Sequence, residues 1–123
     1  MAELLVIDGT SYTVRNSKRG DYVLYQGKPV DPADLQRLLA TSRYSHGRKL
    51  WVTQGGLAGG AVRASGGTHD WLHVYDISIR GWTKAEVWDW CTVAQWNGIR
   101  PFPRGFTWDS FQGRTVSRLN SRP

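Results

Sequence analysis

Residues 64–79 read ASGGTHDWLHVYDISI, and this stretch decides how the rest of the chain is interpreted. The glycines before and within it allow positive φ values and a close approach of the backbone to a bound group. The alternating second half predicts a strand over residues 73–79. His69 precedes that strand, and Asp76 lies within it, seven positions later. Imidazole nitrogen and carboxylate oxygen are ordinary zinc ligands, so the pair is a candidate metal site, although the same spacing also arises by chance.

Side chains of a strand alternate between its two faces. Asp76 is therefore expected on one face of this strand, and His73 on the other face together with Tyr75. This separation makes His73 a poor additional ligand beside Asp76, unless a bulge interrupts the strand.

The run VTQGG…GG…ASGGTHD…YDIS resembles the motif of zinc D-alanyl-D-alanine peptidases, which have the Hedgehog/DD-peptidase fold. It is most similar to the small versions found in actinobacteria and their phages. The resemblance extends upstream to GKPVDPADLQRLL, which is similar to the leading helix of the family, and so covers residues 27–98. It implies that His69 and Asp76 are the first two zinc ligands. It also implies that three further positions shape the loop around the metal: Gln54, Ser65 and Thr68.

The chain also departs from the family pattern. Where the family has glycines between the His and the Asp, this chain has Trp71, Leu72 and His73, whose side chains are expected to fill the substrate cleft. The family has a third zinc ligand, a histidine near the C-terminus, with an acidic residue or histidine before it as the base. No histidine follows His73, and Asp109 is the only carboxylate of the C-terminal region. Asp109 is therefore the candidate catalytic residue, as either the third ligand or the base but not easily both, and zinc is expected without an identified third ligand.

Length and composition indicate one α+β domain, with a small antiparallel sheet flanked by helices as the resemblance implies. The chain has 123 residues, of which 40% are hydrophobic, and this is enough for a core. We expect N-terminal hairpins over residues 1–30, a core matching the family over 31–98, and a basic C-terminal arm over 99–123. No apolar run is long enough to cross a membrane. The first residues do not resemble a signal peptide, so we expect cytoplasmic synthesis, with incorporation into a phage particle as one destination.

Local signals predict two hairpins and two helices. Asp8-Gly9 is a favoured two-residue hairpin turn, and a second extended pair turns at Gln26-Gly27. Asp31-Pro32 is typical of an N-cap followed by proline in the first helical turn. Residues 83–86 form a capping box, which predicts a second helix that ends at Asn97-Gly98. Cys91 lies on the inner stripe of that helix, so we expect a buried, unreactive thiol.

The C-terminal region carries much of the net charge of +6. Residues 99–106 read as an extended segment or edge strand, and the residues from Phe111 onward as either a strand or an arm that a partner orders. Such a basic region favours an anionic surface; its arginines are Arg100, Arg104, Arg114, Arg118 and Arg122.

Three functions remain open from the sequence. The first is an active zinc peptidase that cleaves the peptide stems of the bacterial wall, a chemistry that needs three ligands, an open position and a base. The second, which the missing histidine favours, is a non-catalytic binding or structural module whose partners are virion subunits, further copies of itself, or wall peptide. Seven tryptophans support this function wherever they prove to be exposed. The third, nucleic-acid binding, is less favoured because no recognition motif accompanies the charge.

Overall fold

The computed structural model describes residues 3–45, 47–55, 73–103 and 116–120. These residues form an α+β structure with two helices, two short hairpins and one four-stranded sheet. The predicted class, helices with small antiparallel sheets, is therefore confirmed.

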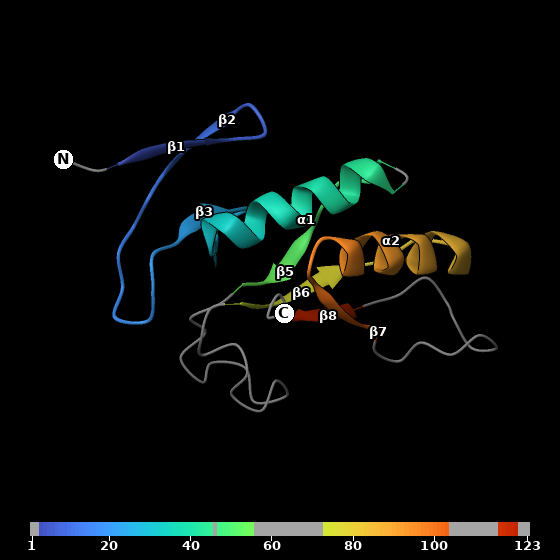
Figure 1. Cartoon of the computed structure of the whole chain (residues 1–123). Coiled ribbons are helices and arrows are strands. Elements are labelled where there is room, and N and C mark those ends of the chain that lie inside the picture. The colour runs from blue at the N-terminus through green and yellow to red at the C-terminus, as the bar shows by residue number, and fades with distance from the viewer. Residues whose placement is uncertain (1–2, 46, 56–72, 104–115, 121–123) are drawn as a thin grey trace.

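The four-stranded sheet is antiparallel throughout and has the order β5-β6-β8-β7. Its strands are β5 (Val52–Gln54), β6 (Val74–Ser78), β7 (Arg100–Pro103) and β8 (Val116–Asn120). Figure 1 shows both helices on the same side of this sheet, with β8 running between β6 and β7. The two prolines of β7 lie on an edge strand, where a missing N–H interrupts no inner ladder.

The two hairpins follow the local turn chemistry. β1 (Leu4–Ile7) pairs with β2 (Thr10–Thr13), and β3 (Val23–Tyr25) pairs with β4 (Lys28–Val30). Both turns need two consecutive residues with positive φ, as in a type I′ turn. The values are 52° and 80° at Asp8 and Gly9, and 53° and 78° at Gln26 and Gly27.

Both helices begin at the caps that the sequence predicts. In α1 (Pro32–Tyr44) the Asp31 carboxylate accepts hydrogen bonds from the first-turn N–H groups of Ala33 and Asp34. In α2 (Lys84–Trp96) Thr83 and Glu86 form a complete capping box. The C-cap of α2 is Asn97, and Gly98 follows with φ 79°.

The core lies between the helices and the sheet. Tyr75 and Ile77 of β6 are fully buried and belong to the same buried cluster as Leu35 and Leu38 of α1 and Trp90 of α2. Two hydrogen bonds join the helices, from Trp90 Nε1 to Ser42 Oγ at 3.1 Å and from Asn97 Nδ2 to Thr41 Oγ1 at 3.0 Å. Cys91 is buried as predicted, and this burial raises the pKa of its thiol to about 11.

The division of the chain differs from the expected one at both ends. Ile7, Val23 and Val30 of the hairpins belong to the same buried cluster as the helices, so residues 1–30 contribute to the core. Residues 100–103 and 116–120 form half of the central sheet, so these parts of the expected arm belong to the fold. Of the two alternatives for the last part of the chain, the strand is the one that the structure contains.

Candidate metal centre and the predicted site residues

The first turn of α1 and the start of β6 meet at a buried carboxylate. Asp34 is 3% exposed, and a buried charge of this kind needs hydrogen-bond partners. Its Oδ2 accepts a hydrogen bond from the Tyr75 hydroxyl at 2.6 Å and lies 2.7 Å from Nδ1 of His73. A carboxylate only accepts, so Nδ1 of His73 carries the hydrogen of this contact. Arg37 lies at 4.0 Å from the other oxygen, Oδ1.

The Tyr75 hydroxyl is the centre of this network. It donates to Asp34 and accepts hydrogen bonds from the backbone N–H of Asp31 at 3.0 Å and of His73 at 3.2 Å. Burial, and secondly the negative charge of Asp34, raise the pKa of this hydroxyl far above its ordinary value. The hydroxyl therefore stays protonated and holds the start of α1 against the start of β6.

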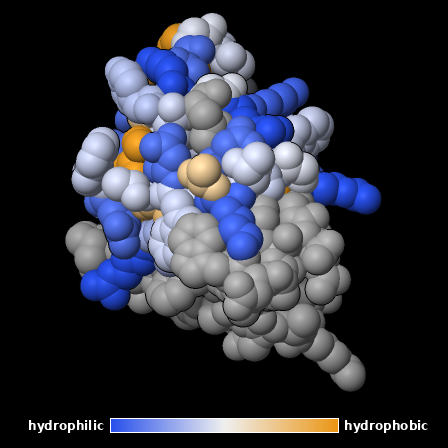
Figure 2. Space-filling view, turned by 90° about the vertical axis from the view of Figure 1, so that its right-hand side faces the viewer, coloured by the Kyte–Doolittle hydropathy of each residue, from blue (hydrophilic) through white to orange (hydrophobic). Residues whose placement is uncertain are grey.

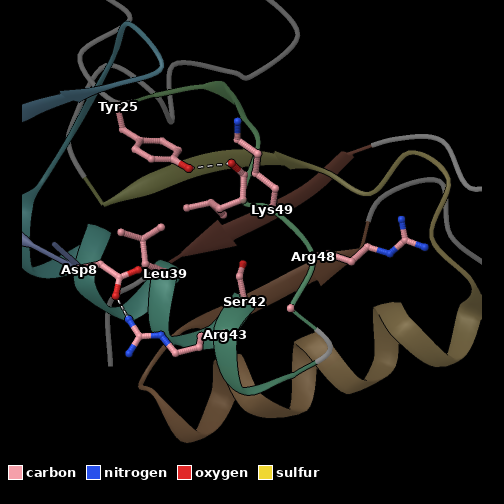
Figure 3. Close-up of a pocket in the computed structure, with 9 residues that line it drawn as sticks. Asp8, Tyr25, Leu39, Ser42, Arg43, Arg48 and Lys49 are labelled. Atoms are coloured by element: carbon pink, nitrogen blue, oxygen red, sulfur yellow. Dashed lines mark hydrogen bonds and ion pairs between the residues drawn. The ribbon is translucent and has the colours of Figure 1, made fainter. Parts of the chain in front are cut away.

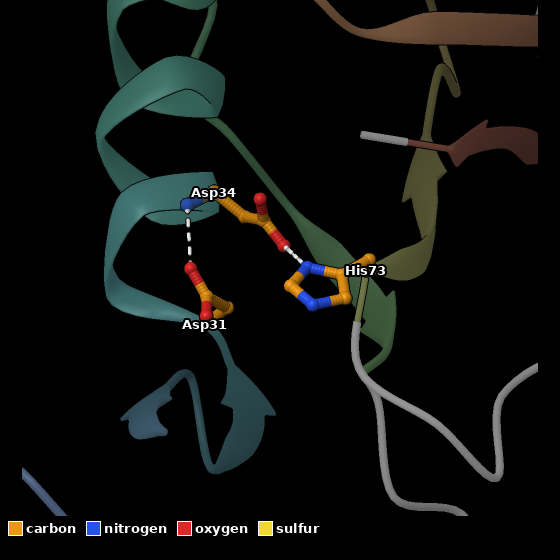
Figure 4. Close-up of side chains that lie close together, drawn as sticks. All are labelled: Asp31, Asp34 and His73. Carbon is orange, nitrogen blue, oxygen red and sulfur yellow. Dashed lines mark hydrogen bonds and ion pairs between the residues drawn. The ribbon is translucent and has the colours of Figure 1, made fainter. Parts of the chain in front are cut away.

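His73 reaches the network through an unusual backbone conformation. Its φ is 83°, a region that residues with a Cβ rarely adopt, at a cost on the order of 1–3 kcal/mol. Figure 4 shows the ring extending from the residue before β6 toward the helix turn that carries Asp31 and Asp34. The His73 side chain is 41% exposed, so the ring is accessible from solvent.

These residues form a group that can hold a metal ion. One ligand atom each from Asp31, Asp34 and His73 lie within 4.8 Å of one another. The start of α1 favours the two carboxylates, because the helix dipole places partial positive charge there. We name these three residues the Asp-Asp-His cluster.

The strand predicted over residues 73–79 is present as β6, Val74–Ser78, and His73 lies just before it with φ 83° rather than in extended conformation. His73 and Tyr75 both contact Asp34, while Asp76, the next residue, lies outside the Asp-Asp-His cluster. Asp76 is itself buried, at 9% exposure, and is the register partner of Gln54 across β5 and β6. Two residues of the family resemblance are thus neighbours in the sheet.

The other neighbour of Asp76 in the sheet lies on β8. On β8 its register partner is Arg118, a residue type that does not ligate metals. The chain has no histidine after His73 that could stand there instead. The residues that the structure describes around Asp76 therefore do not complete the ligand set that the resemblance implies.

The remaining predicted positions divide between described and undescribed parts of the chain. Arg100 is exposed on β7, and Arg118 lies on β8. The others lie outside the described residues: Ser65, Thr68, His69, Trp71, Arg104, Asp109, Arg114 and Arg122.

Sequence reasoning missed both aspartates of the cluster as ligand candidates. Asp31 was recognised only as an N-cap, and Asp34 was read as a residue of the helix. The available signal is the DPAD run, which sets two carboxylates at the start of one helix, combined with the expectation that His73 and Tyr75 share one face of the following strand.

A hollow of about 290 Å³ lies on another part of the surface, beside α1 and the residues that lead into β5. Figure 3 shows Leu39 and Ser42 beneath it, with Arg43 turned toward Asp8, with which it forms an ion pair, and Arg48 directed away. Arg48 is itself paired with Glu86. The basic side chains at this hollow are thus engaged by carboxylates or point outward.

Two of the exposed aromatic residues lie on α2. Among the tryptophans that the structure describes, Trp82 and Trp90 are buried, while Trp96 is 79%, Trp51 53% and Trp88 41% exposed. Trp88 and Trp96 are eight positions apart, so they lie on one side of the helix. On the side seen in Figure 2, hydrophilic side chains cover most of the described surface and hydrophobic residues form small separate areas.

In comparisons with known proteins, no family model, curated protein or solved structure matches this chain. Neither helix of the described chain is long and apolar enough to cross a membrane.

Proposed function

We propose that this chain is a non-catalytic binding or structural module with a DD-peptidase-like fold, and that any zinc it binds has a structural role. Its partner, on this proposal, is a protein subunit, either a second copy or another component of a phage particle, ahead of wall peptide. Nucleic acid ranks last among the partners.

The observation that carries the proposal is the surroundings of Asp76. A zinc peptidase needs three protein ligands, an open position and a base. Asp76 has Arg118 as its register partner on one side and Gln54 on the other, and His73 belongs to the network on the opposite face. The chain also has no histidine after His73 that could serve as the third ligand, and this supports the loss of catalysis.

The exposed tryptophans support a binding role. Trp96 and Trp88 project from the solvent side of α2, and tryptophan is enriched among the residues that dominate interface energies. The formal charge of +6 also favours a partner with an acidic surface.

The first test is an assay of the purified chain, supplied with zinc, on peptides that end in D-alanyl-D-alanine. We expect no release of D-alanine above a blank, while an authentic DD-carboxypeptidase serves as the positive control. Release that disappears in Asp76→Asn would overturn the non-catalytic assignment. It would favour the alternative, an active zinc peptidase, which the pairing of Gln54 with Asp76 supports.

The second test concerns the partner. Sedimentation velocity over a range of concentrations should show self-association, which Trp96→Ala weakens and the hairpin variant Ser11→Ala does not. A chain that stays monomeric, and that also fails to sediment with purified cell wall, would contradict the binding role. Binding to DNA with a steep salt dependence would move nucleic acid to first place.

A further inference from the structure

We propose that the Asp-Asp-His cluster is a divalent-metal site, separate from the position at Asp76 and independent of the proposed function. Its ligands are a ring nitrogen of His73 and one carboxylate oxygen each from Asp31 and Asp34. The site joins the start of α1 to the start of β6, two segments about 40 positions apart in the sequence.

The donor types fit such an ion. One imidazole nitrogen with two carboxylate oxygens suits zinc and neighbouring divalent metals such as cobalt and manganese. Zinc bonds of about 2.0–2.2 Å place tetrahedral ligands about 3.4 Å apart. The ligand atoms already lie within 4.8 Å of one another, and Asp31 and His73 are partly exposed, so their side chains can rotate to close this difference.

Each of the two aspartates has a carboxylate oxygen that can bind the metal. Asp31 uses Oδ1 for both N-cap hydrogen bonds, and Asp34 uses Oδ2 for Tyr75 and His73. Within the described residues, no hydrogen bond engages the second oxygen of either carboxylate, and the nearest cation, Arg37, is 4.0 Å from Asp34 Oδ1. A metal can therefore bind one oxygen of each aspartate without removing the helix cap or the Tyr75 contact.

The charge of the cluster favours a cation. Two carboxylates face one imidazole and one guanidinium, and Asp34 is almost fully buried, where an added positive charge interacts more strongly than in water. The positive φ of His73 holds its ring at the helix turn before any ion arrives. Three ligands from the protein leave at least one coordination position for water or another group.

The test is calorimetric titration of the metal-free chain with zinc chloride, accompanied by a thermal melt with and without zinc. We expect one ion per chain and a higher melting temperature with zinc. Asp31→Asn keeps a good N-cap, and His73→Asn keeps a residue type that tolerates positive φ. Each should weaken zinc binding at least about tenfold, since changes outside the ligand set alone reach this size. Asp21→Asn, an exposed position shortly before β3, is the matched control and should bind as the wild type does.

The result also has to distinguish this site from the one at Asp76. Asp76→Asn and His69→Ala should both retain zinc. No zinc uptake by the wild type, or uptake that survives His73→Asn and Asp31→Asn, would overturn the inference. Uptake that is lost only in His69→Ala or Asp76→Asn would do the same and place the metal at the position that the resemblance implies. A structural ion does not change the outcome of the peptidase assay. Failure of zinc binding would therefore overturn only the inference, and release of D-alanine would overturn only the proposed function.

Discussion

The Tyr75 hydroxyl oxygen makes three hydrogen bonds that join two separate segments of the chain. It holds one side chain and two backbone N–H groups, which belong to the start of α1 and the start of β6. A buried donor or acceptor that loses its partner costs more than a typical hydrogen bond contributes. The position is therefore sensitive to the loss of this single atom.

Tyr75→Phe keeps the ring and removes the hydroxyl, leaving Asp34 and two N–H groups each without one partner. We expect a loss of about 1–3 kcal/mol in the free energy of unfolding, measured by urea denaturation. Tyr44→Phe, at a ring that is 68% exposed, is the control and should stay within about 0.5 kcal/mol of the wild type. Equal effects of the two variants would show that the network contributes nothing to stability.

At the same scale, the sequence predicted that His73 and Tyr75 lie on one face, but it did not predict the Asp-Asp-His cluster. Strand alternation placed His73 and Tyr75 on one face because the period of two is a local property. Strand alternation could not predict that His73 contacts Asp34. The partner of a buried carboxylate depends on how a helix docks against a strand about 40 positions away. Pairing at this distance is set by the packing of the whole core.

Among the elements, the start of α2 carries the clearest electrostatic feature. Glu86 accepts from the N–H of Thr83 at 2.9 Å and forms a two-point ion pair with Arg48, at 2.7 and 2.9 Å. The hydrogen bond from Arg48, and then that from Thr83, lower the pKa of Glu86 to about 2. The pair ties α2 to the segment that leads into β5.

This lowered pKa predicts a pH dependence. The folded pKa lies below the ordinary value of 4.5, so the unfolded chain takes up the proton first as the pH falls. The stability from charged Glu86 is therefore complete above about pH 4.5 and is lost as the pH falls toward 2. The difference in melting temperature between wild type and Glu86→Gln should be largest near neutral pH and should close toward about pH 2. A constant difference would contradict the assignment.

The elements also show where sequence prediction stops. Both hairpins and both helix starts were predicted, because a few adjacent residues, such as Asp8-Gly9 and Thr83, determine each turn or cap. β8 was left open between a strand and an arm. Its ladder partners lie on β6 and β7, and the choice depends on those strands rather than on its own residues.

For the whole molecule, the link between the second hairpin and the sheet depends on Gly55. A Cβ at this position would lie 2.5 Å from the carbonyl oxygen of Pro29 and 2.8 Å from Cβ of Lys28. Both atoms belong to β4 and cannot rotate away. Only a residue without a side chain lets the end of β5 approach the hairpin this closely.

Gly55→Ala should therefore separate the hairpin from the sheet or strain both. We expect a loss of about 1–3 kcal/mol in the free energy of unfolding, the usual size for overpacking, measured by chemical denaturation. Ser11→Ala, at an exposed position of β2, should change it by no more than about 0.5 kcal/mol. An unchanged Gly55→Ala would mean that the contact is not maintained in solution.

The position of β8 in the sheet has a consequence for biosynthesis. Residues 116–120 supply the inner strand that joins β6 to β7, yet they leave the ribosome after both of them. Until they emerge, β6 and β7 present unpaired backbone edges, which are templates for pairing with other chains. The nascent protein therefore passes through an interval of exposed strand edges that ends when β8 is inserted, and a chaperone that covers open strand edges would act during that interval.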